Sequence, residues 1–249
     1  MTLTSWLIVL FIIFISGIVK GTTGFGFALF SVPLLVHFIP IKNLVPLVML
    51  FNLFSSVQIV LQTPKLKINK RILLLSFTGI AGVILGSLVL KFTPEILLEL
   101  FTAIILIVLS ILFLAGYRFK VRKIKRGNAL AGFISGFVGG STSVSGPPLA
   151  LFLTSLKLDT LHFRFTFAWF SIITASVAIL DYMKIGVLKF NTLKVFIVSL
   201  PLLIASIWLG KFISRRIPQH RFYKGAIIVS LLAGLFLLFT CMPGCIRLF

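Results

Sequence analysis

Apolar runs of about 20 residues follow one another along almost the whole chain. An α-helix of that length spans the hydrocarbon core of a bilayer, where every backbone polar group needs a partner within the protein. The composition agrees, because 59% of the 249 residues are hydrophobic and 11% are charged, whereas about a quarter of a soluble domain is charged. The connections are too short to hold a soluble domain. The sequence therefore predicts an all-α polytopic membrane protein with one transmembrane domain over residues 1–249.

Two of the apolar runs are interrupted by residues that stop a helix. Residues 21–26 read Gly-Thr-Thr-Gly-Phe-Gly and run on to Pro33, and residues 139–148 read Gly-Gly-Ser-Thr-Ser-Val-Ser-Gly-Pro-Pro. Glycine favours open backbone conformations and proline lacks an N–H donor. In hydrocarbon, such non-helical chain persists only where protein or a water-filled cavity surrounds it. We therefore predict that the two breaks share one cavity, and that free N–H groups and helix dipoles there favour an anion.

The breaks divide the expected helices into two similar sets. By residue range, the expected helices are 5–19, 27–39, 44–62, 72–90 and 96–116 in the first half, and 128–138, 149–156, 163–183, 190–213 and 222–240 in the second. The helices on either side of each break are too short for a full span. Each half is therefore predicted to be a broken, re-entrant helical hairpin followed by three transmembrane helices.

The two halves, about 1–118 and 127–249, also resemble each other in sequence. Residues 16–21 match 135–140 at an offset of 119, and residues 81–86 match 205–210 at an offset of 124. The second offset also carries Pro94 onto Pro218. This pattern indicates a tandem duplication.

Basic residues gather in the connections and predict the orientation. With the N-terminus outside, 17 Lys and Arg fall on the cytoplasmic side and six on the other, as the positive-inside rule requires. An odd number of crossings then inverts the second half relative to the first and leaves both termini extracytoplasmic. If the breaks lay in fully crossing helices, the basic loop near Arg215 would move outside, which the charge rule disfavours. The net charge of +20 is thus a topology signal, and no nucleic-acid partner is expected.

Interrupted helices that meet at mid-membrane between inverted repeats are typical of secondary transporters. The candidate anion ligands are backbone N–H groups at 23–25 and 141–143, together with polar, cationic or aromatic side chains near the breaks. The candidate substrate-binding residues are Lys20, Thr22, Thr23, Gly24, Phe25, Gly26, Asn52, Ser55, Ser56, Gln58, Gly140, Ser141, Thr142, Ser143, Ser145, Arg164, Thr166 and Trp169.

Several of these residues have a second interpretation. Lys20 either neutralises a bound anion or extends its ammonium group to an interface. Arg164 either attracts anions or only marks the cytoplasmic side, and Trp169 either covers the cavity or packs. The polar residues of 44–62 either line the cavity or form hydrogen bonds between helices. For the pairs Gly82 with Gly86 and Ser206 with Gly210, close helix packing is the preferred interpretation.

Enzymatic, metal and cofactor sites are not expected. The chain has four carboxylates and no buried acidic pair suited to a proton relay, so the coupling ion stays open. It lacks Gly-x-Ser-x-Gly and His-Glu-x-x-His motifs, and Cys241 and Cys245 make a poor zinc site. Their pairing in a disulfide is left open. The alternatives kept are an anion channel and an intramembrane enzyme that uses Ser141, Ser143 or Ser145.

The two breaks also carry a family resemblance. Gly-Thr-Thr-Gly-Phe-Gly-Phe-Ala followed by Ser31-Val32-Pro33, and residues 136–140 followed by Ser145-Gly146-Pro147-Pro148, resemble the paired signatures of the TauE/SafE family of sulfite and organosulfonate exporters. The similarity covers essentially the whole chain, including residues 163–166, although no glycine follows Arg164.

This resemblance implies a multi-pass protein of a prokaryotic plasma membrane that exports small anions such as sulfite or sulfonates. The expected partners are the small anion and the lipid bilayer. A coupling proton or ion and a homodimeric state are compatible with the sequence.

Overall fold

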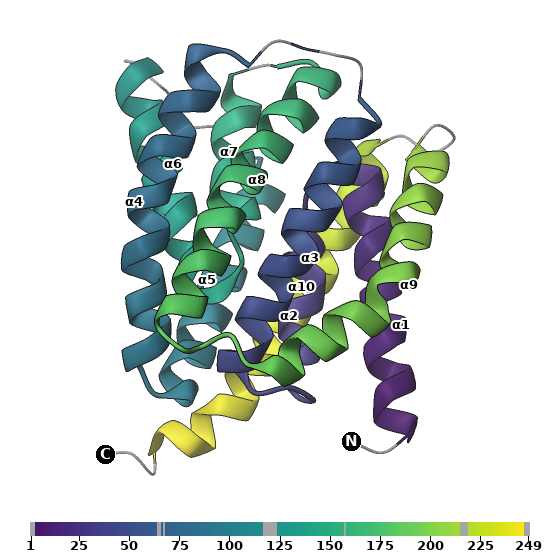
Figure 1. The fold of residues 1–249 in the computed structure, drawn as a ribbon, viewed down its shortest axis with the longest axis vertical. Helices are drawn as coiled ribbons and strands as arrows, with labels where there is room; N and C mark the ends of the chain where they lie inside the picture. Colours follow the sequence, from purple (N-terminus) through teal and green to yellow (C-terminus); the bar gives the residue numbers. More distant parts are fainter. Residues whose placement is uncertain are drawn as a thin grey trace.

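The computed structural model describes residues 3–63, 66, 68–116, 124–156, 158–214 and 219–246, and over these residues the chain is helical, with no strand (Figure 1). The helices are α1 (Leu3–Thr23), α2 (Phe27–Leu35), α3 (Ile41–Leu61), α4 (Lys70–Phe92), α5 (Glu95–Leu114), α6 (Ile124–Thr142), α7 (Gly146–Ser155), α8 (Thr160–Lys184), α9 (Phe190–Ser214) and α10 (Gln219–Ile246). Six of these, α1, α3, α4, α5, α8 and α9, are long and apolar enough to cross a membrane. The prediction of an all-α membrane protein is confirmed.

The helix ends follow ordinary local signals. Asn69 caps α4 by accepting a hydrogen bond from the Ile72 N–H, and Asp159 caps α8 by accepting one from the His162 N–H. Pro40 and Pro94 stand at the N-caps of α3 and α5, where a missing N–H costs nothing. These signals place the long helices close to the ranges expected from sequence.

The helices before the breaks are longer than predicted. α1 has 21 residues and α6 has 19, because the glycines and threonines at 21–23 and 140–142 continue the helix. The prediction that these helices are too short to cross is therefore wrong for α1, which qualifies as a span. α2 and α7 are short, with 9 and 10 residues. Each half thus pairs one long and one short helix around its break.

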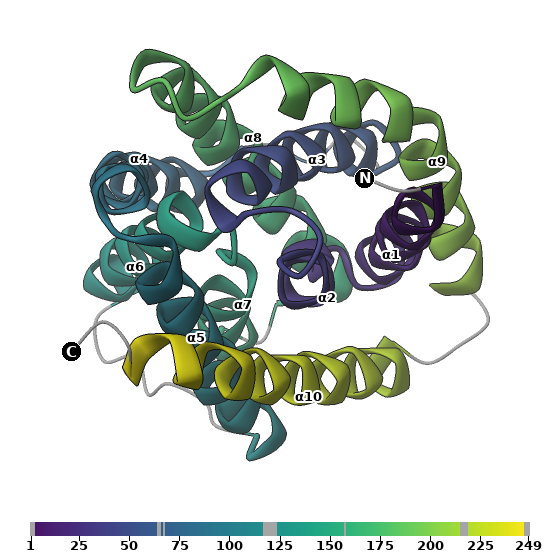
Figure 2. The ribbon, with the colours of Figure 1, turned by 90° about the horizontal axis from the view of Figure 1, so that it is seen from below.

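The short helices lie in the middle of the bundle. Seen from below in Figure 2, α2 and α7 are surrounded by α4 with α6, α1 with α9, α3 with α8, and α5 with α10. Each surrounding pair takes one helix from each half of the chain. Backbone that leaves the helical conformation at the breaks is therefore enclosed by protein, as hydrocarbon surroundings require.

The main helix pairs are preserved when the two halves are exchanged. α4 packs on α6 as its counterpart α9 packs on α1, while α3 with α8 and α5 with α10 are each pairs of counterparts. The start of α1 and the end of α10 lie at the same end of the bundle (Figure 1). This exchange is what a duplicated architecture produces, and the inversion of the halves across a membrane stays a prediction.

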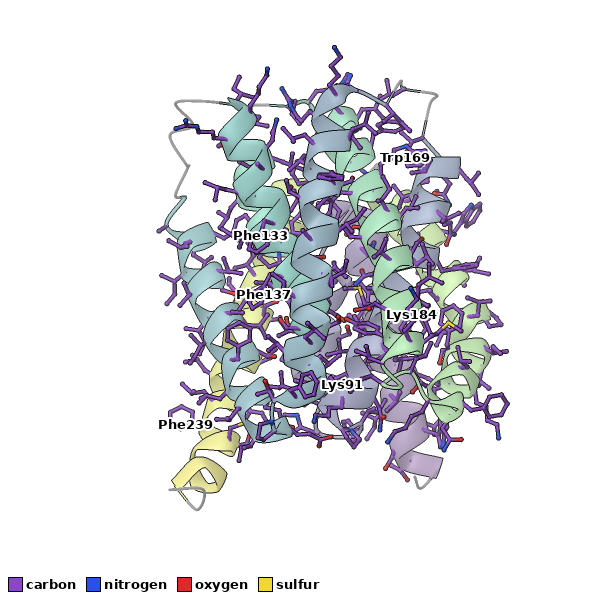
Figure 3. All side chains as sticks on the ribbon, turned by 60° about the vertical axis from the view of Figure 1, so that its left-hand side comes forward. Lys91, Phe133, Phe137, Trp169, Lys184 and Phe239 are labelled. Atoms are coloured by element: carbon purple, nitrogen blue, oxygen red, sulfur yellow. The ribbon has the colours of Figure 1, made fainter. Side chains whose placement is uncertain are left out.

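Glycines hold two of the helix pairs at close range. A Cβ on Gly82 would lie 2.2 Å from the Phe133 carbonyl oxygen, and one on Gly136 would lie 2.1 Å from the Gly79 carbonyl oxygen, so α4 and α6 meet backbone to backbone. Figure 3 labels Phe133 and Phe137, which neighbour these glycines in the sequence of α6. A Cβ on Gly210 would lie 2.5 Å from the Ile18 carbonyl oxygen across the α1–α9 contact. The packing interpretation of the glycine pairs is confirmed.

Candidate functional site

The two breaks have the same backbone structure. Gly24 and Ser143, 119 residues apart, have φ angles of 85° and 62°, in the left-handed region that ends a helix. The Gly24 N–H donates to the Lys20 carbonyl oxygen at 2.8 Å, and the Ser143 N–H donates to the Gly139 carbonyl oxygen at 2.8 Å. The duplication therefore extends to the local geometry of the breaks.

A threonine completes each helix end. The Thr23 hydroxyl donates to the Val19 carbonyl oxygen at 2.7 Å and accepts from the Phe25 N–H at 3.2 Å. The Thr142 hydroxyl donates to the Val138 carbonyl oxygen at 2.8 Å and accepts from the Val144 N–H at 3.3 Å. Each threonine therefore satisfies an N–H group just past its helix.

These bonds correct the predicted anion donors. The N–H groups of Gly24, Phe25 and Ser143 all donate within their own break. The physical reason is that 23–25 and 141–143 form the ends of α1 and α6, and a helix end has free carbonyl groups, not free N–H groups. Free N–H groups belong to the first turn of the next helix. The donors therefore lie a few residues further on, at the starts of α2 and α7.

Side chains of α8 cover the free carbonyl groups. The Arg164 guanidinium donates to the Gly21 carbonyl oxygen at 2.9 Å, and the Tyr182 hydroxyl donates to the Gly140 carbonyl oxygen at 2.6 Å. A cation at the C-terminal end of α1 also suits the helix dipole. Arg164 packs over Gly24, where an added Cβ would lie 2.7 Å from the arginine Cγ. Arg164 thus stabilises the first break directly.

Both breaks contribute to one cavity, as the sequence predicts. Its lining residues are Gly26, Ala28, Leu29, Asn52, Ser143, Ser145, Gly146 and Phe167. Four of them, Gly26, Asn52, Ser143 and Ser145, belong to the predicted site. The space is small, with room for about one water molecule. An oxyanion is larger than water, so its binding requires the helices to move apart.

The helix starts at this cavity differ in the donors that they provide. α2 begins at Phe27 with no side-chain capping bond from Gly26, so the N–H groups of its first turn have no partner within the helix. α7 begins with Gly146, Pro147 and Pro148, and the two prolines carry no N–H. The N-terminus of α2 is therefore the better backbone site for an anion.

Lys20 is fully buried beside this cavity. Its exposed fraction is 0%, and its Nζ donates to Asn52 Oδ1 at 2.9 Å, to Ser56 Oγ at 3.0 Å and to the Asn52 carbonyl oxygen at 3.3 Å. The described residues include all four carboxylates of the chain, and none of these forms an ion pair with Lys20. The ammonium group does not reach an interface, so the burial contradicts that interpretation of Lys20.

Several other predicted site residues bond to their own helix. The Thr22 hydroxyl donates to the Val19 carbonyl oxygen, and the Ser141 hydroxyl donates to the Phe137 carbonyl oxygen. The Ser55 hydroxyl donates to the Phe51 carbonyl oxygen. The Ser143 hydroxyl instead donates to the Val45 carbonyl oxygen of α3 at 2.6 Å, which holds the second break against that helix.

The remaining predicted residues pack or face other helices. Gln58 Nε2 donates to the Ile204 carbonyl oxygen of α9 at 3.3 Å, and a Cβ on Gly140 would lie 2.4 Å from the Val83 carbonyl oxygen of α4. Gly140 therefore serves helix packing. The Phe25 ring packs edge-on against Phe163 and at a tilt against Phe167, at centroid distances of 5.8 Å and 5.4 Å.

Thr166 and Trp169 lie outside the cavity lining. Thr166 is buried, and Trp169 packs against Phe165 toward the upper end of the bundle (Figure 3). The indole N–H of Trp169 is buried without a hydrogen-bond partner. Their roles in binding stay predictions.

Sequence reasoning missed four residues that line the cavity and one that supports it. Ala28, Leu29, Gly146 and Phe167 line the space, and Tyr182 bonds to the second break. The first N–H groups of a helix have no partner within it. Applied to the helix that follows Gly26, this rule would have indicated Ala28 and Leu29. No spacing links Tyr182 to Gly140, because they meet only in the folded chain.

Comparison with known proteins supplies one match over most of the chain. The family model described as sulfite exporter TauE/SafE matches residues 9–237. This region contains both breaks, Lys20 and every residue that lines the cavity. Neither a curated protein nor a solved structure matches the chain.

Proposed function

Because the chain belongs to the sulfite exporter TauE/SafE family, which is a family of transporters, we propose that it exports a small oxyanion such as sulfite or an organosulfonate. The membrane would be the plasma membrane of a prokaryotic cell, with both termini outside. The observation that carries this proposal is that both helix breaks line one cavity.

The charge distribution at the cavity supports an anion over a cation. Asn52, which lines the cavity, is bonded to a buried ammonium group, and none of the chain's carboxylates pairs with that group. The N-terminal turn of α2 adds the positive end of a helix dipole. A unit charge about 7 Å from a bound ion contributes about 2 kcal/mol at an effective dielectric constant of ~20. That contribution changes affinity by more than tenfold.

The small size of the cavity supports alternating access over an open pore. This cavity has room for about one water molecule, so an oxyanion does not fit between the two breaks in this conformation. The exchange of packing partners between the halves supports an inverted repeat, in which rocking of the halves would expose the same site to either side. We propose this cycle as the mechanism, with the coupling ion to be identified by flux measurements.

The arrangement of the serines supports transport over the enzymatic alternative. The Ser141 and Ser143 hydroxyls donate to backbone carbonyl oxygens, not to a histidine base. A serine nucleophile requires a base within hydrogen-bond reach.

Purified protein in liposomes tests the proposal. Liposomes loaded with sulfite, methanesulfonate, sulfate or phosphate are diluted into anion-free buffer, and efflux is followed with and without imposed proton and sodium gradients. We expect saturable efflux of sulfite or a sulfonate that protein-free liposomes lack. Flux that rises linearly with concentration would indicate a channel, and no flux of any anion would contradict the proposal.

A further inference from the structure

We propose that Asn52 is the side chain that contacts the anion, and that Lys20 is a positioning residue that acts through it. Lys20 would hold the Asn52 amide with its NH₂ group toward the cavity and place a positive charge behind it. This inference rests on the proposed function and identifies the two residues that make that site selective for an anion.

The orientation of the Asn52 amide follows from the chemistry of its partner. An ammonium group has three donors and no acceptor, so the amide atom that faces Lys20 Nζ at 2.9 Å is the oxygen Oδ1. The Asn52 NH₂ group therefore points away from the lysine. Without this lysine, an asparagine at position 52 could turn either its amide oxygen or its NH₂ group toward the cavity.

Only one of the two residues reaches the cavity. Asn52 lines it and is 9% exposed, whereas Lys20 is 0% exposed and does not line it. The three donors of Lys20 meet three acceptors, which are the two oxygens of Asn52 and the Ser56 hydroxyl. The ammonium group is thus fully bonded before any anion arrives, and the amide carries its effect to the anion.

The missing counter-charge favours an anion at this position. A buried charge is costly unless it is paired, and Lys20 pairs with none of the chain's four carboxylates. A bound oxyanion beside Asn52 would supply the opposite charge. Because a neutral amide separates the two charges, the anion would be attracted without a direct ion pair, which would allow its release.

The sharpest variant is Asn52→Asp. A carboxylate keeps an oxygen for Lys20 and neutralises it, but removes the NH₂ donor and opposes the anion. The matched control is Asn191→Asp, which makes the same chemical change at an exposed position in the first turn of α9, outside the cavity lining. Lys20→Met is matched by Lys42→Met, since Lys42 donates to the Lys91 carbonyl oxygen away from the cavity.

The measurement is the shift in melting temperature of the full-length purified protein with sodium sulfite or methanesulfonate, against sodium chloride at equal ionic strength. We expect Asn52→Asp and Lys20→Met each to weaken anion affinity about tenfold or more, and both controls to stay within about twofold. Asn52→Asp should melt no lower than the wild type without anion, because its carboxylate pairs with Lys20.

A double variant separates positioning from direct contact. If Lys20 acts through Asn52, Lys20→Met should weaken affinity far less in an Asn52→Ala background than alone. Equal losses in both backgrounds would overturn the positioning role, and wild-type affinity in Asn52→Asp would overturn the contact. A wild type that binds an anion in the melting assay but fails to transport it refutes only the proposed function. A wild type that binds none of the anions refutes both.

Discussion

The α1–α2 and α6–α7 hairpins share a backbone design but differ in chemistry. Both end their long helix with the same turn and the same threonine bonds. At equivalent positions, however, the first hairpin has Lys20 where the second has Gly139, and the second has prolines where the first has N–H donors. The comparison teaches that a duplicated frame can keep its backbone geometry while only one of its two copies supplies the buried charge and the free N–H donors.

The largest expected difference concerns how each hairpin packs on its neighbour. Gly136→Ala would place a Cβ 2.1 Å from the backbone oxygen of Gly79, whereas Gly17→Ala would meet the Ser206 side chain, whose Oγ lies 1.9 Å away. We expect Gly136→Ala to lower the free energy of unfolding by about 3 kcal/mol, because neither backbone can yield without shifting a helix.

The control for this prediction is a compensating change. Removing the neighbouring side chain with Ser206→Gly should restore much of the stability of Gly17→Ala in a thermal melt. If Gly136→Ala and Gly17→Ala lose equal stability, and Ser206→Gly does not restore that of Gly17→Ala, the packing of the two hairpins does not differ in this way.

An intermediate effect is expected at the free carbonyl groups. Arg164→Met removes a charged donor from the Gly21 oxygen and should cost about 2 kcal/mol, whereas Tyr182→Phe removes a neutral donor from the Gly140 oxygen and should cost about 1 kcal/mol. Melting temperature and anion affinity are measured together. If Arg164→Met leaves stability unchanged but weakens anion affinity, Arg164 attracts anions and does not stabilise the first break.

The smallest effects are expected where the hairpins are most alike. Thr23→Val and Thr142→Val each remove the same pair of hydrogen bonds and should each cost about 1 kcal/mol. Affinity for the anion should not change, because these hydroxyls serve the helix ends. Loss of affinity in either variant would place that hydroxyl at the anion.

Much of this architecture could be predicted from sequence because its signals are local. Apolar length predicts the membrane helices, and glycine with proline predicts the breaks, since both act within a few residues. The shared cavity follows from a general requirement, that non-helical chain in a membrane be enclosed.

The details of the site could not be predicted in the same way. Thr23 and Thr142 extend α1 and α6 by bonding back to earlier carbonyl groups, and this shifts the free N–H groups onto α2 and α7. The partners of Lys20 lie 32 and 36 residues away, and only helix packing decides which of its neighbours it meets.

Protection of two cysteines by the same anion tests the central claim most directly. Ala28→Cys and Ser145→Cys place one thiol on each side of the cavity, in a background with Cys241→Ser and Cys245→Ser. The rate of N-ethylmaleimide labelling is measured with increasing methanesulfonate, or with whichever inert sulfonate binds in the melting assay. If both breaks contact one anion, the anion should protect both thiols from labelling, and the anion concentration that gives half-maximal protection should be the same for both. Protection of one thiol alone, or of neither, would contradict it.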